Sequence, residues 1–176
     1  MKYKVPAMSN SDIVKLTQDF RKSLGYKKDE PIDILWVLEY AMREMFKRYN
    51  FDFVVKPIEE MSEHAYTDSD KIYIREDIYD RAFNGEGRDR FTIAHEIGHY
   101  ILHTGSGMVR FHRIYPGDNV KPYEDSEWQA DSFAGEFLCP AQSIKGMDAQ
   151  DVAEKYGISI KAANAQLKKS RRCFQQ

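Results

Sequence analysis

The sequence predicts an α+β fold, in which a helix-rich single domain packs a small antiparallel sheet against a helix that carries an HExxH motif. Apolar residues recur at helical spacing along most of the chain, and only residues 51–75 alternate as strands do. A length of 176 residues fits one domain that buries roughly 70% of its unfolded surface. We expect N-terminal helices in residues 1–50, the sheet and core in 51–140, and a helix-turn-helix-like appendage in 147–176.

Two helices are predicted before the sheet. The first carries Ile13, Leu16 and Phe20 on one face and ends at Gly25. Pro31 is expected to begin the second, because proline suits the first helical position. The apolar residues of this second helix follow a period of 3.6: Ile34, Val37, Leu38, Ala41, Met45 and Phe46.

The sheet is predicted from alternation. Phe51, Phe53 and Val55 alternate with polar residues, which is typical of a half-buried strand. Residues 65–75 indicate a hairpin that turns at residues 68–70, where Asp and Ser gather. These strands together favour a small antiparallel sheet.

A third helix is predicted over residues 88–103, because Phe91, Ala94, Ile97 and Ile101 lie on one face of it. Glycines before and after this stretch are typical helix ends. The next helix is expected to start after an N-cap at Asp125 or Ser126 and to stop at Pro140. Its small residues Ala130 and Ala134 would let it approach the preceding helix closely.

The HExxH motif, His95 to His99, predicts a metal site. Residues at i and i+4 share one face of a helix, so His95 and His99 can ligate a single ion. Glu96 lies between them and can reach a water molecule on that ion, which predicts a general base. This geometry is typical of a zinc peptidase.

A hydrolytic zinc site usually takes three protein ligands, so a third must come from elsewhere in the chain. Glu127 and Asp131 lie one turn apart on the next helix. We assign Glu127 as the third ligand. Asp131 is expected to accept a hydrogen bond from a ligating histidine and to fix its tautomer.

The chain has three further histidines. His103 is rotated by about 80° from His95 and lies about 12 Å along the axis, too far for the same ion. It is expected to contact the last carbonyls of the helix or to support a ligand. His112 ranks behind Glu127 as a ligand, and His64 is expected to be a surface or packing residue. Three residues are candidates, in no order of preference, for stabilising the tetrahedral oxyanion of peptide hydrolysis: Tyr123, His112 and Tyr100.

The stretches RFTIAHEIGHYILH and E-x-x-A-D-x-F-A-x-x-F-L-x-P resemble the ImmA/IrrE family of bacterial and phage-borne zinc peptidases, a branch with a glutamate ligand. The resemblance covers Ile58 to Pro140 well. It implies Zn²⁺ bound by His95, His99 and Glu127, with Glu96 as general base. Cys139 stands where the family often has another apolar residue, which leaves the catalytic roles intact.

The same resemblance implies an endopeptidase that cuts a regulatory protein, namely a helix-turn-helix repressor of a mobile element, a prophage or a stress response. We expect the substrate to bind in an extended conformation and to add a strand to the sheet edge near the hairpin. Such pairing aligns a peptide backbone with the metal-binding helix whatever its side chains are.

Composition excludes several other classes. A net charge of −2 argues against a polybasic nucleic-acid binder and against an acidic disordered chain. Two cysteines and no apolar leader segment favour a cytoplasmic protein. The longest apolar run, residues 34–38, is far too short to span a bilayer, so no membrane partner is expected.

Residues 148–169 predict a helix, a glycine turn and a second helix with Ser159 as its cap, followed by basic residues. This outline is shared with DNA-reading helix-turn-helix units, so a DNA-binding regulator is one alternative function. Direct nucleic-acid binding is disfavoured because Asp148, Asp151 and Glu154 on the first helix would repel phosphate. A non-cleaving toxin, antitoxin or scaffold protein is the other alternative, and the intact Glu96 disfavours it.

Overall fold

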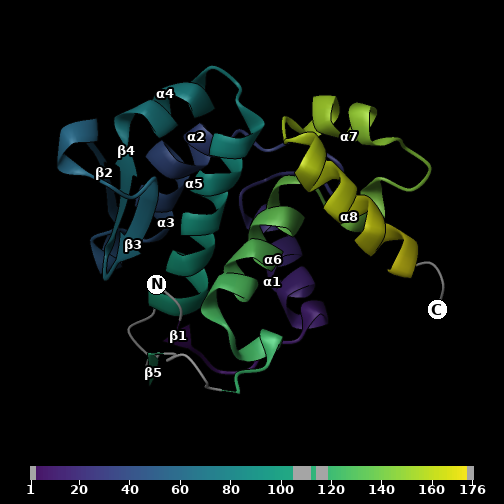
Figure 1. Cartoon of the computed structure of the whole chain (residues 1–176), viewed down its shortest axis with the longest axis horizontal. Helices are drawn as coiled ribbons and strands as arrows, with labels where there is room; N and C mark the ends of the chain where they lie inside the picture. The colour runs from purple at the N-terminus through teal and green to yellow at the C-terminus, as the bar shows by residue number, and fades with distance from the viewer. Residues whose placement is uncertain (1–2, 105–111, 114–118, 174–176) are drawn as a thin grey trace.

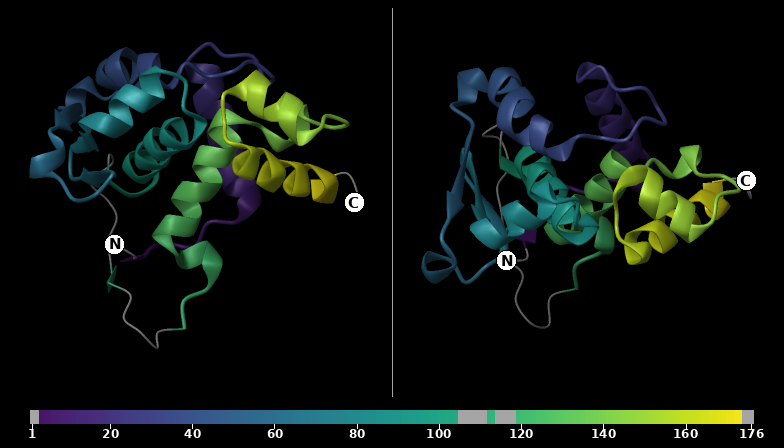
Figure 2. Two further views of the ribbon diagram at one scale, coloured as in Figure 1. Left: turned by 45° about the horizontal axis from the view of Figure 1, so that its top comes forward. Right: turned by 90° about the horizontal axis from the view of Figure 1, so that it is seen from above.

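The structure, a computed structural model, describes residues 3–104, 112–113 and 119–173. It has the predicted α+β class, with a three-stranded sheet at one side of the molecule and helices making up the rest (Figure 1). Helix α5 (Gly87–His99) runs through the middle, between the sheet and helix α6 (Ser126–Leu138). Figure 2 shows from two further directions that the C-terminal helices lie on the side of α6 away from the sheet. This arrangement places the motif helix at the centre of the molecule.

The N-terminal helix α1 (Asn10–Ser23) packs against α6. It begins with a capping box, in which Ser9 and Asp12 exchange side-chain and backbone hydrogen bonds. It ends just before Gly25, whose φ of +85° requires a glycine-like residue. The end at Gly25 agrees with the end predicted from the sequence.

The second predicted helix begins later than proposed, at Ile34, so the start at Pro31 is wrong. Asp33 is the N-cap, because its carboxylate accepts a hydrogen bond from the Trp36 amide at 3.1 Å. The helix then runs without a break through three segments: α2 (Ile34–Trp36), a π-helical turn (Val37–Ala41) and α3 (Met42–Met45).

The three-stranded sheet is mixed, and not purely antiparallel as predicted. β3 (Ala65–Asp68) and β4 (Lys71–Arg75) form the expected hairpin. β2 (Asp52–Lys56) pairs with β4 in parallel, in the order β2-β4-β3. β2 and β3 form the two edges of the sheet, and the hairpin after β3 places β4 between them. β2 and β3 are therefore antiparallel to each other without being neighbours.

Several short elements complete the fold. Helix α4 (Glu76–Phe83) follows β4 directly, and β1 (Tyr3–Lys4) pairs with β5 (His112–Arg113). A π-helical turn (Tyr100–Thr104) continues α5. The described chain also has four 3-10 turns, which were not predicted from the sequence: Lys47–Tyr49, Ile58–Glu60, Pro122–Glu124 and Ala141–Ser143.

The C-terminal pair has the predicted form. α7 (Ala149–Tyr156) and α8 (Ile160–Cys173) are joined at Gly157, whose φ is +59°. The Ser159 hydroxyl accepts a hydrogen bond from the Ala162 amide at 3.2 Å and so caps α8. On the face toward α6, Gln166 is buried and donates to the carbonyl of Cys139. The pair is thus part of the packed structure.

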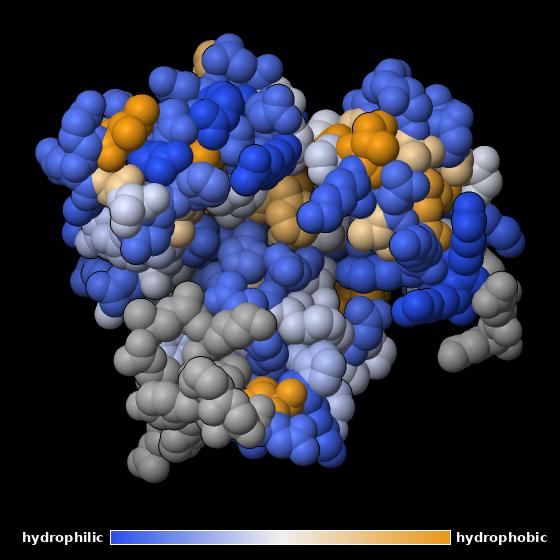
Figure 3. All heavy atoms as spheres, in the orientation of Figure 1, coloured by the Kyte–Doolittle hydropathy of each residue, from blue (hydrophilic) through white to orange (hydrophobic). Residues whose placement is uncertain are grey.

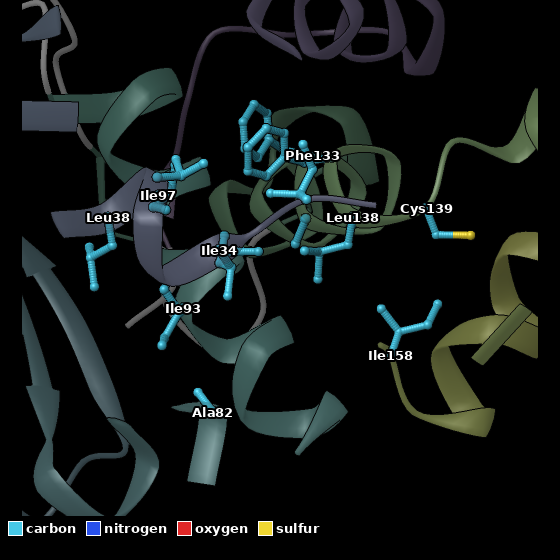
Figure 4. Packing of buried hydrophobic residues seen from close by; sticks show 14 of the residues in the cluster. Ile34, Leu38, Ala82, Ile93, Ile97, Phe133, Leu138, Cys139 and Ile158 are labelled. Atoms are coloured by element: carbon cyan, nitrogen blue, oxygen red, sulfur yellow. The ribbon is translucent and has the colours of Figure 1, made fainter. Parts of the chain in front are cut away.

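The core gathers side chains from α2, α5 and α6, as Figure 4 shows for Ile34, Ile97 and Phe133. Helices α5 and α6 approach each other closely at Gly98. A Cβ there would lie 3.0 Å from the Phe133 ring and 3.3 Å from the carbonyl oxygen of Ala130. The absence of side-chain bulk at Gly98 and Ala130 therefore brings the two helices together, as the small residues of α6 predict.

Replacement of Gly87 by Ala is expected to destabilise the protein by about 1–3 kcal/mol. A Cβ at Gly87 would lie 2.5 Å from the carbonyl carbon of Ile158 and 2.6 Å from the amide of Ser159, and backbone atoms cannot yield cheaply. Urea unfolding measures the loss, with Arg88→Ala at the neighbouring exposed position as control. Equal stability of the two variants would mean that the turn before α8 is free to move.

The face in Figure 3 is largely hydrophilic, and hydrophobic colour gathers mainly over α7 and α8. Within the described part of the chain, every helix is too short or too polar to cross a membrane.

Candidate functional site

The structure brings together the side chains of His95, His99 and Glu127, the three ligands proposed from the sequence. The Nε2 atoms of His95 and His99 lie 2.9 Å apart. Oε2 of Glu127 lies 3.4 Å from the first and 3.7 Å from the second. The two histidines lie one turn apart on α5, while the first turn of α6 supplies the carboxylate. These three groups form a candidate metal-binding triad.

The triad fits a tetrahedral divalent cation. Ligands about 2.0–2.1 Å from such an ion lie roughly 3.3 Å from one another, and the observed separations bracket that value. Two imidazole nitrogens and one carboxylate oxygen are the donor types that zinc accepts in hydrolytic sites.

His95 is supported from behind by Asp131. Oδ1 of Asp131 lies 2.8 Å from Nδ1 of His95, on the opposite side of the ring from the triad. The Asp131 side chain is 62% exposed. Its carboxylate accepts the hydrogen of Nδ1, so in the neutral ring the lone pair is on Nε2, which faces Glu127 and His99.

His99 contacts a different group, the buried His103. The two Nδ1 atoms lie 3.1 Å apart, and Nε2 of His103 lies 3.0 Å from Oε1 of Gln129. Burial lowers the pKa of His103 to about 4, against the hydrogen bond to Gln129, so the ring is neutral. The sequence suggested a supporting role for His103 but gave no sign of Gln129.

The triad holds protons firmly when no ion is bound. Burial alone would lower the pKa of His95, but hydrogen bonds to Asp131 and Glu127 raise it to about 9. Burial would raise the pKa of Glu127, but the adjacent imidazoles of His95 and His99 hold it well below its usual range. A proton on His95 therefore competes with a cation for the triad.

Metal affinity is expected to rise with pH. His95 holds a proton up to about pH 9 and must lose it to ligate, so the association constant should increase about tenfold per pH unit below that value. Competition with a chelator at pH 6.5, 7.5 and 8.5, corrected for the chelator's own protonation, measures this slope. An affinity independent of pH over that range would contradict the proton count.

Glu96 lies beside the triad and points to the sheet. It is 7% exposed, and its Oε2 accepts a hydrogen bond from the Thr67 hydroxyl at 2.8 Å. The same hydroxyl lies 3.0 Å from the backbone carbonyl of Glu96. Sequence reasoning missed Thr67. The available signal was its position on the same strand face as Ala65, which packs toward the core.

Replacement of Thr67 by Val is expected to lower kcat roughly 10- to 100-fold while metal content stays unchanged. Valine keeps the shape but removes the donor that holds the Glu96 carboxylate, and small misplacements of a catalytic group are costly. Steady-state kinetics measures the effect. Thr92→Val is the control, because among the described residues the Thr92 hydroxyl bonds only the carbonyl of Arg88 on the same helix. An unchanged kcat in Thr67→Val would remove this positioning role.

The triad opens into a cleft of about 1090 Å³ between β3, α5 and the start of α6. The described wall residues of the cleft include no Lys or Arg. Tyrosines and carboxylates dominate instead: Tyr3, Tyr49, Tyr66, Tyr100, Glu63, Asp68, Asp70, Glu96 and Glu127. The cleft is thus wide, polar and acidic, with the triad at its wall.

Of the three oxyanion candidates, only Tyr100 is seen at the cleft. Its ring is buried against Phe46 and Phe51, and its hydroxyl has no hydrogen-bond partner among the described residues. Tyr123 is 39% exposed and is not among the described residues that line the cleft. The side chain of His112 lies outside what the structure describes, although its backbone forms part of β5.

None of the curated proteins matches the chain closely enough to count as a relative. The model of the Peptidase_M78 family, described as the IrrE N-terminal-like domain, matches residues 46–168. This match spans most of the chain and contains the three-stranded sheet, the triad and every described residue of the cleft wall except Tyr3. It supports a metallopeptidase-type function with a protein substrate. The chain therefore belongs to the family of the IrrE N-terminal-like domain.

Proposed function

We propose that this protein is a zinc-dependent endopeptidase that cuts a regulatory protein, a helix-turn-helix repressor of a mobile element, a prophage or a stress response. The observation that carries the proposal is the convergence of His95, His99 and Glu127 at an open cleft, with Glu96 beside them. The family of the chain supports the same class of chemistry.

A zinc ion bound by the triad would polarise the scissile carbonyl and acidify a water molecule. Glu96 takes the proton of the attacking water on its carboxylate and passes it to the leaving amine. Thr67 holds that carboxylate in place through the 2.8 Å hydrogen bond to Oε2. The reaction consumes one water per peptide bond and needs no covalent intermediate with the protein.

The edge of β3 is the proposed docking site for the substrate backbone. Among the described strands, β3 pairs with β4 alone, and residues 65–68 line the cleft. An extended peptide that pairs with this edge runs beside α5, so its backbone passes the triad. Main-chain pairing supplies affinity, and the side-chain positions of the cleft supply selectivity.

The charge of the cleft supports a basic substrate. Glu63, Asp68 and Asp70 lie along the wall, and the described wall has no cationic Lys or Arg to neutralise them. An acidic cleft attracts cationic segments and repels acidic ones. DNA-binding proteins carry basic surfaces for phosphate contacts, so a repressor has the complementary charge.

Co-expression tests the proposal. The protein is produced together with a candidate repressor encoded beside its gene and a reporter under that repressor's operator. The expected result is a shortened repressor and an active reporter. A silent reporter with full-length repressor would reject this repressor as the substrate. An active reporter with full-length repressor would favour sequestration over cleavage.

A further inference from the structure

The environment of His99 contains a chain of buried side chains that ends on two backbone carbonyls. It runs from His99 on α5 to His103 in the following π-helical turn and then to Gln129 on α6. The contacts are 3.1 Å between the two Nδ1 atoms and 3.0 Å from Nε2 of His103 to Oε1 of Gln129. His103 is 3% exposed and Gln129 is 1% exposed. The hydrogen positions along this chain can be worked out from its far end.

The orientation of the Gln129 amide is fixed by what it contacts. Its Nε2 lies 2.9 Å from the carbonyl oxygen of Pro6 and 2.8 Å from that of Tyr123. Carbonyl oxygens only accept, so the NH₂ group must point toward them and Oε1 must point toward His103. Oε1 also only accepts. The Nε2 atom of His103 therefore carries a hydrogen.

This assignment passes on to His99. A neutral His103 with its hydrogen on Nε2 has a lone pair on Nδ1. Nδ1 of His99 must then carry the hydrogen that joins the two rings. The remaining nitrogen of His99, Nε2, is left with a lone pair directed at His95 and Glu127. In the opposite arrangement, His99 would carry its hydrogen on Nε2 and could not ligate a cation.

We propose that Gln129 and His103 are positioning residues that fix the tautomer of His99, so that Nε2 of His99 is available to the metal. The inference rests on the metal-dependent function proposed above and extends it to residues outside the triad. The two ligating histidines are thereby supported in different ways. The exposed carboxylate of Asp131 holds His95. His99 is held instead by the buried, neutral pair His103 and Gln129, which we call the relay.

The relay also joins the N-terminal segment to the metal site. Pro6 belongs to an N-terminal segment that lies alongside residues 123–125. In this pairing the Val5 amide donates to the carbonyl of Glu124, and the Met8 amide donates to the carbonyl of Tyr123. Gln129 donates hydrogen bonds to both paired segments, because the Pro6 carbonyl belongs to one and the Tyr123 carbonyl to the other. The N-terminal segment thus takes part in orienting a ligand that lies far from it in sequence.

The first test is a tautomer measurement on the zinc-loaded wild-type protein. Long-range ¹H–¹⁵N NMR of the histidine rings distinguishes a hydrogen on Nδ1 from one on Nε2. The expected result is a hydrogen on Nε2 of His103 and on Nδ1 of His99. A hydrogen on Nδ1 of His103 would overturn the proposal, and this measurement needs no substitution that might unfold the protein.

The second test uses Gln129→Met and His103→Phe, which keep size and remove the hydrogen bonds. Zn²⁺ affinity, measured by chelator competition, is expected to fall about 10- to 100-fold in both variants. In Gln129→Met, the NMR spectrum should also show His103 shifting toward a hydrogen on Nδ1, which a purely structural role would not cause. Gln150→Met on the exposed face of α7 is the control and should bind Zn²⁺ as the wild type does.

The outcomes separate the two proposals. Wild-type affinity in both variants, with Zn²⁺ bound normally by the wild type, would overturn the relay and leave the peptidase function untouched. Failure of the wild type to bind Zn²⁺ would overturn both.

Discussion

Replacement of Glu96 by Gln is expected to abolish peptide-bond cleavage while the protein stays folded and metal-loaded. Glu96 is not part of the triad, so the ion keeps its three ligands. Glutamine preserves the size of the side chain and can still accept the hydrogen bond from Thr67. It cannot take up a proton at neutral pH, so kcat should fall by about 10²–10⁴-fold. Substrate cleavage and metal content are measured on the same preparation.

A matched control is Glu63→Gln, which removes another carboxylate of the cleft wall and leaves the triad alone. We expect its kcat to stay near that of the wild type. The assignment of Glu96 as general base fails if Glu96→Gln cleaves as fast as Glu63→Gln. It also fails if Glu96→Gln loses its metal, because Glu96 would then be a ligand.

Replacement of His95, His99 or Glu127 by Ala is expected to remove the metal and, with it, all activity. Each supplies one of the three donor atoms that lie within 4.8 Å of one another, and two ligands hold zinc poorly. Metal content after extensive dialysis measures the loss. Full occupancy in any one of these variants would reject that residue as a ligand.

Asp131→Asn is the informative comparison for Glu127→Ala. Asp131 contacts His95 at Nδ1, on the side away from the triad, so its loss should weaken binding only about 10- to 100-fold. If Asp131→Asn emptied the site while Glu127→Ala kept the metal, the two carboxylates would have exchanged roles. Circular dichroism of each variant checks that the helices remain formed.

The helix boundaries were predictable where a local signal sets them. Gly25 ends α1, and Asp125 caps α6 with a 2.9 Å hydrogen bond from the Glu127 amide. Ser159 caps α8 in the same way. In each case the deciding contact joins residues close in sequence, so the sequence pattern contains it. The cap at Asp33 is equally local and was overlooked in favour of Pro31.

The strand order was not predictable from alternation. Alternation identifies strands but says nothing about which neighbour a strand takes. The parallel pairing of β2 with β4 depends on how the segment before β3 crosses the sheet, which only the packed structure decides. Helix α4 was missed because it follows β4 without a break, so no turn residue separates the two.

In the candidate site too, residues set by local spacing were predictable and residues set by packing between elements were not. The three triad residues follow from spacing on two helices, because i and i+4 positions share a face. Thr67 and Gln129 could not be found this way. Thr67 contacts Glu96 of α5 from strand β3, and Gln129 contacts His103 from helix α6. Their roles depend on the packing of α5 against β3 and against α6, and Gly98 and Ala130 permit the close approach to α6.

The central claim, metal-dependent hydrolysis of a repressor, is tested most directly by intact-mass spectrometry of the repressor after incubation with the purified protein. The account predicts two fragments whose masses sum to that of the repressor plus one water. They should disappear after metal chelation and return with added Zn²⁺. An intact repressor that is nevertheless released from its operator by the Zn²⁺-loaded protein would contradict the account, because the protein would then act by binding its partner and not by cutting it.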